Sequence, residues 1–172
     1  MNFKVAQAMH AHAIHNTRVA SSLDLDSKLG PGYWSHPTKL GSVKERIQLG
    51  DPDKLRRKTI YVACDGGIVV GSVSVASFLP SFWKASYWSD PKARALGVFD
   101  LVVPPERQKQ GIGRFLMSSV EQLAREHGFE YVRLDAYSEN PNSVSFYRAI
   151  GYENSIEISV RGCPIQLFER AL

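Results

Sequence analysis

The sequence contains few cysteines and no long apolar run. Of its 172 residues, only Cys64 and Cys163 are cysteines, and they form no CxxC pair. We therefore expect two free thiols, with neither as a catalytic nucleophile, rather than a disulfide-stapled fold. No apolar run approaches the ~20 residues that cross a bilayer, and the N-terminal residues lack the apolar core of a signal peptide. A cytoplasmic protein without a membrane partner is expected.

Concentrated charge and metal-ligand spacing are also lacking. The net charge is +4, and the densest basic run, residues 54–58, lies between a turn and an expected strand, as a solvated loop does. A nucleic-acid-binding module needs clustered basic residues interleaved with aromatics, so nucleic acid is not expected as a partner. The spacing of His10, His12 and His15 fits no zinc pattern, which predicts surface histidines and no metal.

What is present suits one globular domain. Hydrophobic residues make up 44% of the chain, and no repeat or linker divides it, so we expect a single domain over residues 1–172. Apolar periodicity and turn residues define the expected elements. The expected strands are 3–9, 59–64, 68–75, 95–103, 131–137 and a closing hairpin around Arg161-Gly162. The expected helices are 13–23, one from a capping box at Ser42 to Gly50, 112–127, and one from Asn140-Pro141 to Gly151.

The order of these elements predicts an α/β fold with a mixed sheet. Asp65-Gly66-Gly67 joins two β-rich runs, as in a hairpin. The strands at 95–103 and 131–137 are separated by a helix, which indicates a right-handed parallel crossover.

The segment Val103–Arg114 indicates a phosphate site between a strand and a helix. Gly111 and Gly113 remove side chains where the helix begins, so free N–H groups and the positive helix end can face an anion. Arg107, Lys109 and Arg114 add positive charge there. A P-loop would need G-x-x-x-x-G-K-[ST], and a dinucleotide fingerprint would need a third glycine where Leu116 stands, so both are excluded.

Two motifs resemble those of the general-control-type N-acetyltransferase (GNAT) superfamily. Gln108-x-x-Gly111-x-Gly113, after a strand ending in Leu101-Val102-Val103, is similar to the family's acetyl-CoA pyrophosphate loop. Asn140-x-x-Ser143-x-x-Phe146-Tyr147-x-x-x-Gly151-Tyr152 is similar to its later motif. The match covers roughly residues 95–153, and the first 50 residues show no motif.

The resemblance implies a single-domain GNAT-like fold whose central sheet splays between its fourth and fifth strands. It implies acetyl-CoA as the acetyl donor, bound mostly by main chain, with a backbone N–H near Leu101 polarising the thioester carbonyl during direct attack by an amine. The implied cofactor-binding residues are Leu101, Val102, Val103, Gln108, Lys109, Gln110, Gly111, Ile112, Gly113, Arg114, Asn140, Ser143 and Tyr147.

Proton transfer is assigned to two side chains. Tyr147 occupies the family position that protonates the departing thiolate, with core packing as the alternative. Asn140 suits both a helix N-cap and a cofactor contact. Some family members use a Glu base on the fourth strand, where this chain has Gly97, so Asp100 is the substitute: burial in an apolar strand would raise its pKa. An ion-paired Asp100 is the alternative, and Asp135 carries the same ambiguity.

The acceptor is expected to be a primary amine of a small molecule or of a protein or peptide. Trp34, Phe82, Trp83 and Trp88 are expected to line its cleft, with core packing as the alternative. A non-catalytic acyl-CoA sensor is the competing function, and we expect a monomer or a homodimer.

Overall fold

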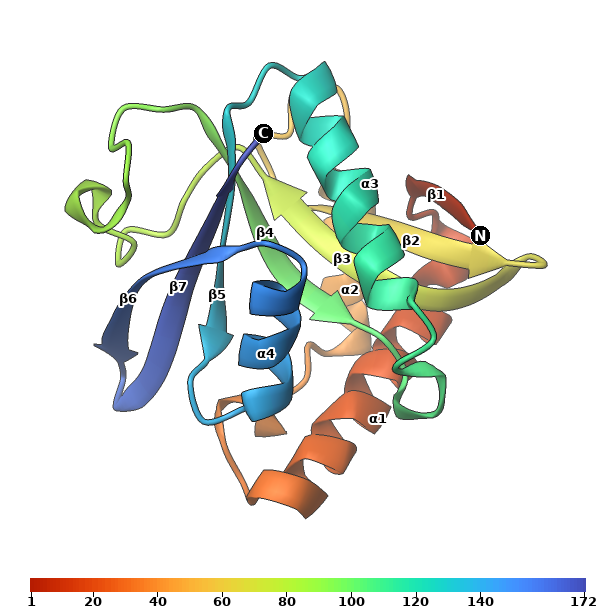
Figure 1. Ribbon diagram of the computed structural model, residues 1–172. Coiled ribbons are helices and arrows are strands. Elements are labelled where there is room, and N and C mark those ends of the chain that lie inside the picture. Colours follow the sequence, from red (N-terminus) through yellow and green to blue (C-terminus); the bar gives the residue numbers. More distant parts are fainter.

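The computed structural model describes residues 1–172, except for the side chains of Tyr33 and Asn154. It has an α/β fold in which one seven-stranded sheet lies between two helical layers (Figure 1). The strands are β1 (Asn2–Val5), β2 (Thr59–Asp65), β3 (Ile68–Ala76), β4 (Ala95–Val102), β5 (Tyr131–Tyr137), β6 (Glu153–Val160) and β7 (Cys163–Ala171). The α-helices are α1 (Ala11–Leu29), α2 (Leu40–Leu49), α3 (Ile112–Glu126) and α4 (Pro141–Ala149).

The sheet is mixed, as the order of elements predicts. Its strand order is β1-β2-β3-β4-β5-β7-β6, with β4 and β5 parallel and the other neighbouring pairs antiparallel. The β2–β3 hairpin turns at Gly66 and Gly67, whose φ values of 55° and 85° suit the predicted turn. The closing hairpin turns at Arg161 and Gly162, both also at positive φ. The parallel crossover through α3 is confirmed.

Alternation along the strands assigns the helices to opposite faces of the sheet. In β2, Tyr61 and Ala63 join the core cluster that includes α3 and α4, whereas Ile60 and Val62 join the cluster that includes α1 and α2. We call these the α3/α4 face and the α1/α2 face. On the α1/α2 face the segment between β3 and β4 adds a third cluster, which includes Leu167 of β7.

Several sequence-based boundaries near the N-terminus are wrong. The first strand ends at Val5, and α1 runs from Ala11 to Leu29, longer than expected at both ends. The helix predicted to start with a capping box at Ser42 starts at Leu40 and has Lys39 as its N-cap, without a side-chain cap. Leu40 packs with Val43 on the α1/α2 face, and this burial extends the helix by its N-terminal residues.

The expectation of surface histidines is wrong for His10. Its side chain is buried, and its Nδ1 accepts a hydrogen bond of 2.9 Å from the Gln7 N–H. Burial, and then the nearby charge of Lys4, lowers the pKa of His10. His10 therefore serves as a neutral partner for the turn that precedes α1. The two cysteines are free, as expected.

Candidate functional site

The parallel strands β4 and β5 separate after a short paired stretch. Their pairing runs from Ala95↔Tyr131 to Gly97↔Arg133, after which the two strands diverge (Figure 1). Beyond that point β5 remains paired with β7 on its other side. The facing edges over residues 98–102 and 134–137 therefore present peptide groups that no neighbouring strand of the described chain pairs. This is the splay that the resemblance implies.

A bulge shapes the β4 side of this opening. The register with β3 moves from Ser74↔Phe99 to Ser72↔Val102, so β4 has one extra residue there. Asp100 lies in the bulge with φ of 50°, a left-handed conformation that Asp tolerates better than most residues. The bulge directly precedes Leu101, whose N–H the resemblance implies as the oxyanion donor.

The start of α3 has no side-chain cap. Gly111 is its N-cap residue, with φ of 83°, and none of the described side chains caps the first-turn N–H groups. Lys109 is also left-handed, with φ of 61°. Successive N–H groups in such a loop form a concave anion site, and the positive end of a 15-residue helix adds to it. The loop before α3 therefore has the geometry of a phosphate site.

The two glycines of this loop have different structural reasons. A Cβ on Gly111 would meet nothing within 4 Å, so this glycine leaves an open approach to the helix start. A Cβ on Gly113 would lie 3.1 Å from the Phe146 ring, so this glycine permits α3 and α4 to approach closely. Gly111 is thus explained by its left-handed conformation at an open position, whereas Gly113 is explained by packing.

The other residues predicted to bind the cofactor in this loop have different roles: some hold the loop by hydrogen bonds, and some supply positive charge. Gln108 Nε2 donates to the Val103 carbonyl at 3.3 Å, and Gln110 Nε2 donates to the Glu106 carbonyl at 3.1 Å. Ile112 is buried in the core. The two glutamines thus hold the loop, while the exposed Arg114 supplies charge at the helix start.

The start of α4 confirms the predicted cap. Asn140 is buried, and its Oδ1 accepts from the Ser143 N–H at 3.3 Å, with Pro141 at the first helical position. This fixes the end of α4 that lies beside β5.

Tyr147 is enclosed on the α3/α4 face. Its side chain is 7% exposed, and its ring lies 5.9 Å from Tyr152 and 5.6 Å from Phe168. Burial, and then the negative charge of Asp135, raises the pKa of Tyr147 well above its usual range. The hydroxyl therefore keeps its proton at neutral pH, as an acid requires, while the ring also packs in the core.

The two candidate carboxylates lie in different surroundings. Asp100 is exposed, so the sequence-based premise that it is buried is wrong. Its Oδ2 lies 3.1 Å from Arg46 Nη1 and 3.5 Å from Arg18 Nη2, which is the ion-paired alternative. Asp135 is half-buried and accepts a hydrogen bond of 3.2 Å from Trp83 Nε1. Burial raises the pKa of Asp135, against the opposing effects of that hydrogen bond and of Lys58.

The predicted aromatic residues do not form one group. Trp83 and Trp88 are each 4% exposed and pack with Ile165 and Leu167, as the core-packing alternative requires. Phe82 is 38% exposed on the same segment. These three residues of the β3–β4 connection therefore divide into two core residues and one surface residue.

Trp34 has a different setting. Its ring meets Tyr137 of β5 edge-on at 4.6 Å, and its carbonyl accepts a hydrogen bond of 2.6 Å from Ser22 Oγ of α1. Ser21 of α1 also donates to the Val103 carbonyl beyond β4, at 3.4 Å. Trp34 therefore links α1 to the end of β5, beside the splay on the α1/α2 face.

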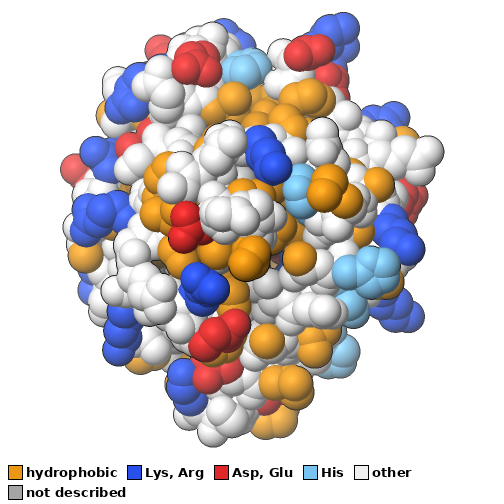
Figure 2. All heavy atoms as spheres, turned by 90° about the vertical axis from the view of Figure 1, so that its right-hand side faces the viewer, with side chains coloured by type: hydrophobic (Ala, Val, Ile, Leu, Met, Phe, Trp, Pro, Cys, Tyr) orange, Lys and Arg blue, Asp and Glu red, His pale blue; other side chains and the backbone are white. Residues whose placement is uncertain are grey.

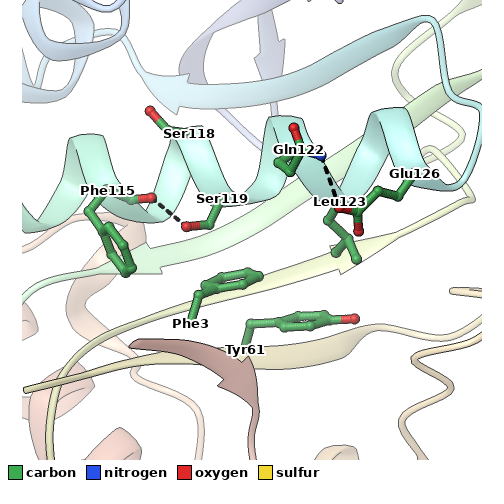
Figure 3. Close-up of a pocket in the computed structure, with 8 residues that line it drawn as sticks. All are labelled: Phe3, Tyr61, Phe115, Ser118, Ser119, Gln122, Leu123 and Glu126. Atoms are coloured by element: carbon green, nitrogen blue, oxygen red, sulfur yellow. Dashed lines mark hydrogen bonds between the residues drawn. The ribbon is translucent and has the colours of Figure 1, made fainter. Parts of the chain in front are cut away.

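One groove on the surface lies away from this site. A groove of about 430 Å³ runs between β1 and α3, with Phe3 stacked on Tyr61 at 4.8 Å and Phe115 and Leu123 above them (Figure 3). On the side that carries β1, hydrophobic side chains reach the surface among scattered basic and acidic ones (Figure 2). None of the predicted site residues lines this groove, so we place the chemistry at the splay.

No helix among the described residues is both long and apolar enough to pass through a membrane. The described part of the chain also contains no group of three or more His, Cys, Asp or Glu arranged to hold a metal ion.

Comparisons with known proteins agree with this geometry. A sequence model described as "Acetyltransferase (GNAT) family" matches residues 27–152. The uncharacterized N-acetyltransferase ycf52 of Gracilaria tenuistipitata var. liui is 29% identical over 124 residues, covering 64% of this chain and 65% of that protein. Among the curated relatives, the matched segments span 39% to 65% of their length.

Solved structures share the fold at low sequence identity. A phosphinothricin acetyltransferase from Sinorhizobium meliloti, solved in complex with acetyl-CoA, has a TM-score of 0.73 at 19% identity, covering 99% of this chain and 88% of that one. A ribosomal-protein-alanine N-acetyltransferase from Brucella melitensis has a TM-score of 0.71 at 17% identity, covering all of both chains.

Proposed function

Since this chain belongs to the acetyltransferase (GNAT) family, we propose that it transfers an acetyl group from acetyl-CoA to a primary amine. The acceptor is a small molecule or a peptide, and the amine attacks directly, without a covalent enzyme intermediate. The observation that carries the proposal is the uncapped start of α3, which lies beside the splayed edges of β4 and β5. A diphosphate and an amide-containing arm fit these two features side by side.

The residues that would hold acetyl-CoA are those with unpaired backbone groups. The N–H groups of residues 111–114, with the charges of Lys109 and Arg114, suit the pyrophosphate. Open space over Gly111 supports the fit, because nothing would meet an atom placed there. The β4 edge at 101–103 suits the amides of the pantetheine arm, and the cofactor supplies the acetyl thioester. Asn140 and Ser143 border the same opening from α4.

The Leu101 N–H and the Tyr147 hydroxyl would act on the donor side. The Leu101 N–H, directly after the bulge, would donate to the acetyl oxygen as negative charge develops there. The Tyr147 hydroxyl would supply the proton that the leaving sulfur takes. The hydroxyl is protonated at neutral pH and so can donate, while its raised pKa makes it a weaker acid than a free phenol.

Asp135 suits the base role better than Asp100. Asp100 already neutralises two arginines, whereas Asp135 has a raised pKa in a half-buried position. Asp135 opposes Leu167 in the register, so it lies on the α1/α2 face, across the sheet from Tyr147. An acid and a base on opposite sides of the splay suit an amine that enters from one face and a sulfur that leaves toward the other.

A thiol-release screen tests the proposal. Purified protein with acetyl-CoA is offered amines, polyamines, amino acids, aminoglycosides and peptides, and free CoA thiol is measured. Turnover that depends on both substrates is expected for at least one class. Tight CoA binding without turnover on any amine would instead favour an acyl-CoA sensor, and absence of CoA binding would overturn the site itself.

A further inference from the structure

A group of cations lies on the α1/α2 face around one carboxylate. We call Arg18, Arg46, Lys58 and Asp100 the Arg18 cluster. Asp100 Oδ2 lies within 3.5 Å of both arginines. Lys58 Nζ lies 3.9 Å above the Phe99 ring, beside them. Two arginines thus pair with one carboxylate, and Lys58 adds a third positive charge nearby, with Asp135 as the next acidic neighbour.

Arg18 is buried with unused hydrogen-bond donors. Its side chain is 4% exposed, and only its Nη2 has partners, Ser74 Oγ at 3.4 Å and Asp100. Its Nε and Nη1 are buried without a hydrogen-bond partner among the described residues. Buried guanidinium N–H groups are normally paired, and a charged group without full pairing is costly to bury. A buried cation with unused donors is typical of a site that a ligand completes.

The surrounding charges also favour an added anion. Burial first, and the like charge of Arg46, lower the pKa of Arg18 despite Asp100. Burial likewise lowers the pKa of Lys58, with Arg46 and Arg18 adding to the effect and Asp100 and Asp135 opposing it. The cluster therefore has excess positive charge that the described chain does not neutralise.

The cluster lies where an acceptor would approach. Ser22, one helical turn after Arg18, binds the Trp34 carbonyl, and Trp34 reaches the end of β5. The Trp34 Nε1–H is also buried without a partner among the described residues. Arg18 of α1 and Trp34 of the loop after it thus both have unpaired buried donors on the face opposite Tyr147.

We propose that the acceptor amine carries its own oxyanion, a carboxylate or a phosphonate, which binds to Arg18, Arg46 and Lys58. This inference rests on the proposed acetyl transfer and names the substrate class. Because Arg18 is nearly enclosed, the site suits a small amino acid-like molecule rather than the surface of a folded protein.

The first test compares matched acceptors. Each small amino acid or aminophosphonate is paired with its uncharged amide or ester, at a pH where both amines are largely deprotonated. We expect the anionic member to have a kcat/KM at least tenfold higher. Turnover that is equal for both members, or confined to polyamines or peptides, would overturn the inference and leave acetyl transfer standing.

The second test uses variants of the partly exposed cations. Arg46, with 34% of its side chain exposed, and Lys58 are replaced in Arg46→Gln and Lys58→Gln, with Arg57→Gln as the control, because Arg57 is exposed and outside the cluster. Loss of one charge-assisted hydrogen bond should raise the acceptor KM roughly tenfold or more. CoA affinity should be nearly unchanged, and so should kcat at a pH above the acid limb of Asp135, whose pKa Lys58 affects. Arg57→Gln should match the wild type.

A binding measurement keeps the inference testable without turnover. CoA-saturated protein is titrated with inorganic phosphate at constant ionic strength, and the tryptophan indole N–H signals are followed by NMR. We expect saturable shifts in the wild type and in Arg57→Gln, and affinity reduced about tenfold in the two cluster variants. Equal responses in all four proteins would show that the cluster binds no oxyanion, whereas failure of CoA to bind at all would count against the proposed function instead.

Discussion

The substitution Tyr147→Phe separates a chemical role of Tyr147 from its packing, because Phe keeps the ring and lacks only the hydroxyl. In Tyr147→Phe the contacts with Tyr152 and Phe168 remain, so stability should fall by no more than about 1 kcal/mol, the net value of one hydrogen bond. The turnover number should fall by up to ~10²–10⁴-fold, the usual contribution of a general acid, with water as a substitute donor at the low end. Urea unfolding measures the stability, single-turnover kinetics measure the chemical step, and a CoA titration checks that cofactor affinity is unchanged. Unchanged kcat where chemistry limits turnover would reassign Tyr147 to packing.

Asp135 predicts a pH dependence with a defined sign. As a base it must be ionised, so kcat/KM should fall as pH drops through its raised pKa. Asp135→Asn should lower kcat and remove that acid limb. Asp100→Asn should retain the limb, because Asp100 forms ion pairs rather than accepting the proton. A preserved acid limb in Asp135→Asn would eliminate it as the base.

The pH dependence of stability that Asp135 contributes has the opposite sign from that of an ion-paired carboxylate. Because the pKa of Asp135 is raised in the folded state, the native protein holds this proton more tightly than the unfolded chain does. Its contribution to stability is therefore largest below the unfolded pKa and is lost as pH rises through the folded pKa. Asp135→Asn should consequently be no less stable than the wild type at neutral pH, which urea unfolding measures.

The start of α3 is tested by charge at constant side-chain size. Gly111→Asp and Gly111→Asn add similar side chains into open space, and Asp and Asn both tolerate the left-handed conformation and the N-cap position. Both variants should fold, as circular dichroism can verify. The Asp variant alone places a negative charge where the pyrophosphate should approach, so its CoA affinity should fall much further than that of Asn. Equal affinities would mean that the pyrophosphate binds elsewhere.

The connection between β3 and β4 provides a matched pair of aromatic residues. Trp83 is buried, stacks on Phe99 at 5.7 Å and donates to Asp135, whereas neighbouring Phe82 is largely a surface residue. Trp83→Ala should lower stability by about 3–5 kcal/mol, and Phe82→Ala by much less. Thermal unfolding with the acceptor KM distinguishes the roles. If Trp83→Ala were stable and only the acceptor KM were raised, Trp83 would be assigned to the acceptor cleft rather than to the core.

For the molecule as a whole, acetyl-CoA or CoA should raise the melting temperature. A ligand that binds only the native state stabilises by mass action, about 2.7 kcal/mol at one hundred times its Kd. NAD and ATP should have smaller effects, because no other phosphate motif is recognised in the sequence. A larger shift with another nucleotide than with CoA would contradict the assignment of the loop before α3.

Much of the chain from residue 59 onward was predictable from local sequence. The Asp65-Gly66-Gly67 turn, the Asn140 cap and the glycine at the start of α3 act through their own backbone conformations, which neighbouring residues determine. The β-rich composition of β2 and the helical period of α3 likewise predict these elements without knowledge of what they pack against. These features defined the α/β class and the position of the phosphate loop.

Other features depended on contacts between distant residues, which local sequence does not encode. The sequence predicts Asp100 as a buried residue of an apolar strand. In the structure a bulge turns it toward Arg18 and Arg46, which are distant in the sequence. From the sequence, Trp83 and Trp88 could line the acceptor cleft or pack in the core. Their packing against β7 decides for the core. Burial of His10 and the unpaired donors of Arg18 have the same origin. Motif and turn chemistry thus determined the donor side, whereas only tertiary packing decided which charges meet on the acceptor side.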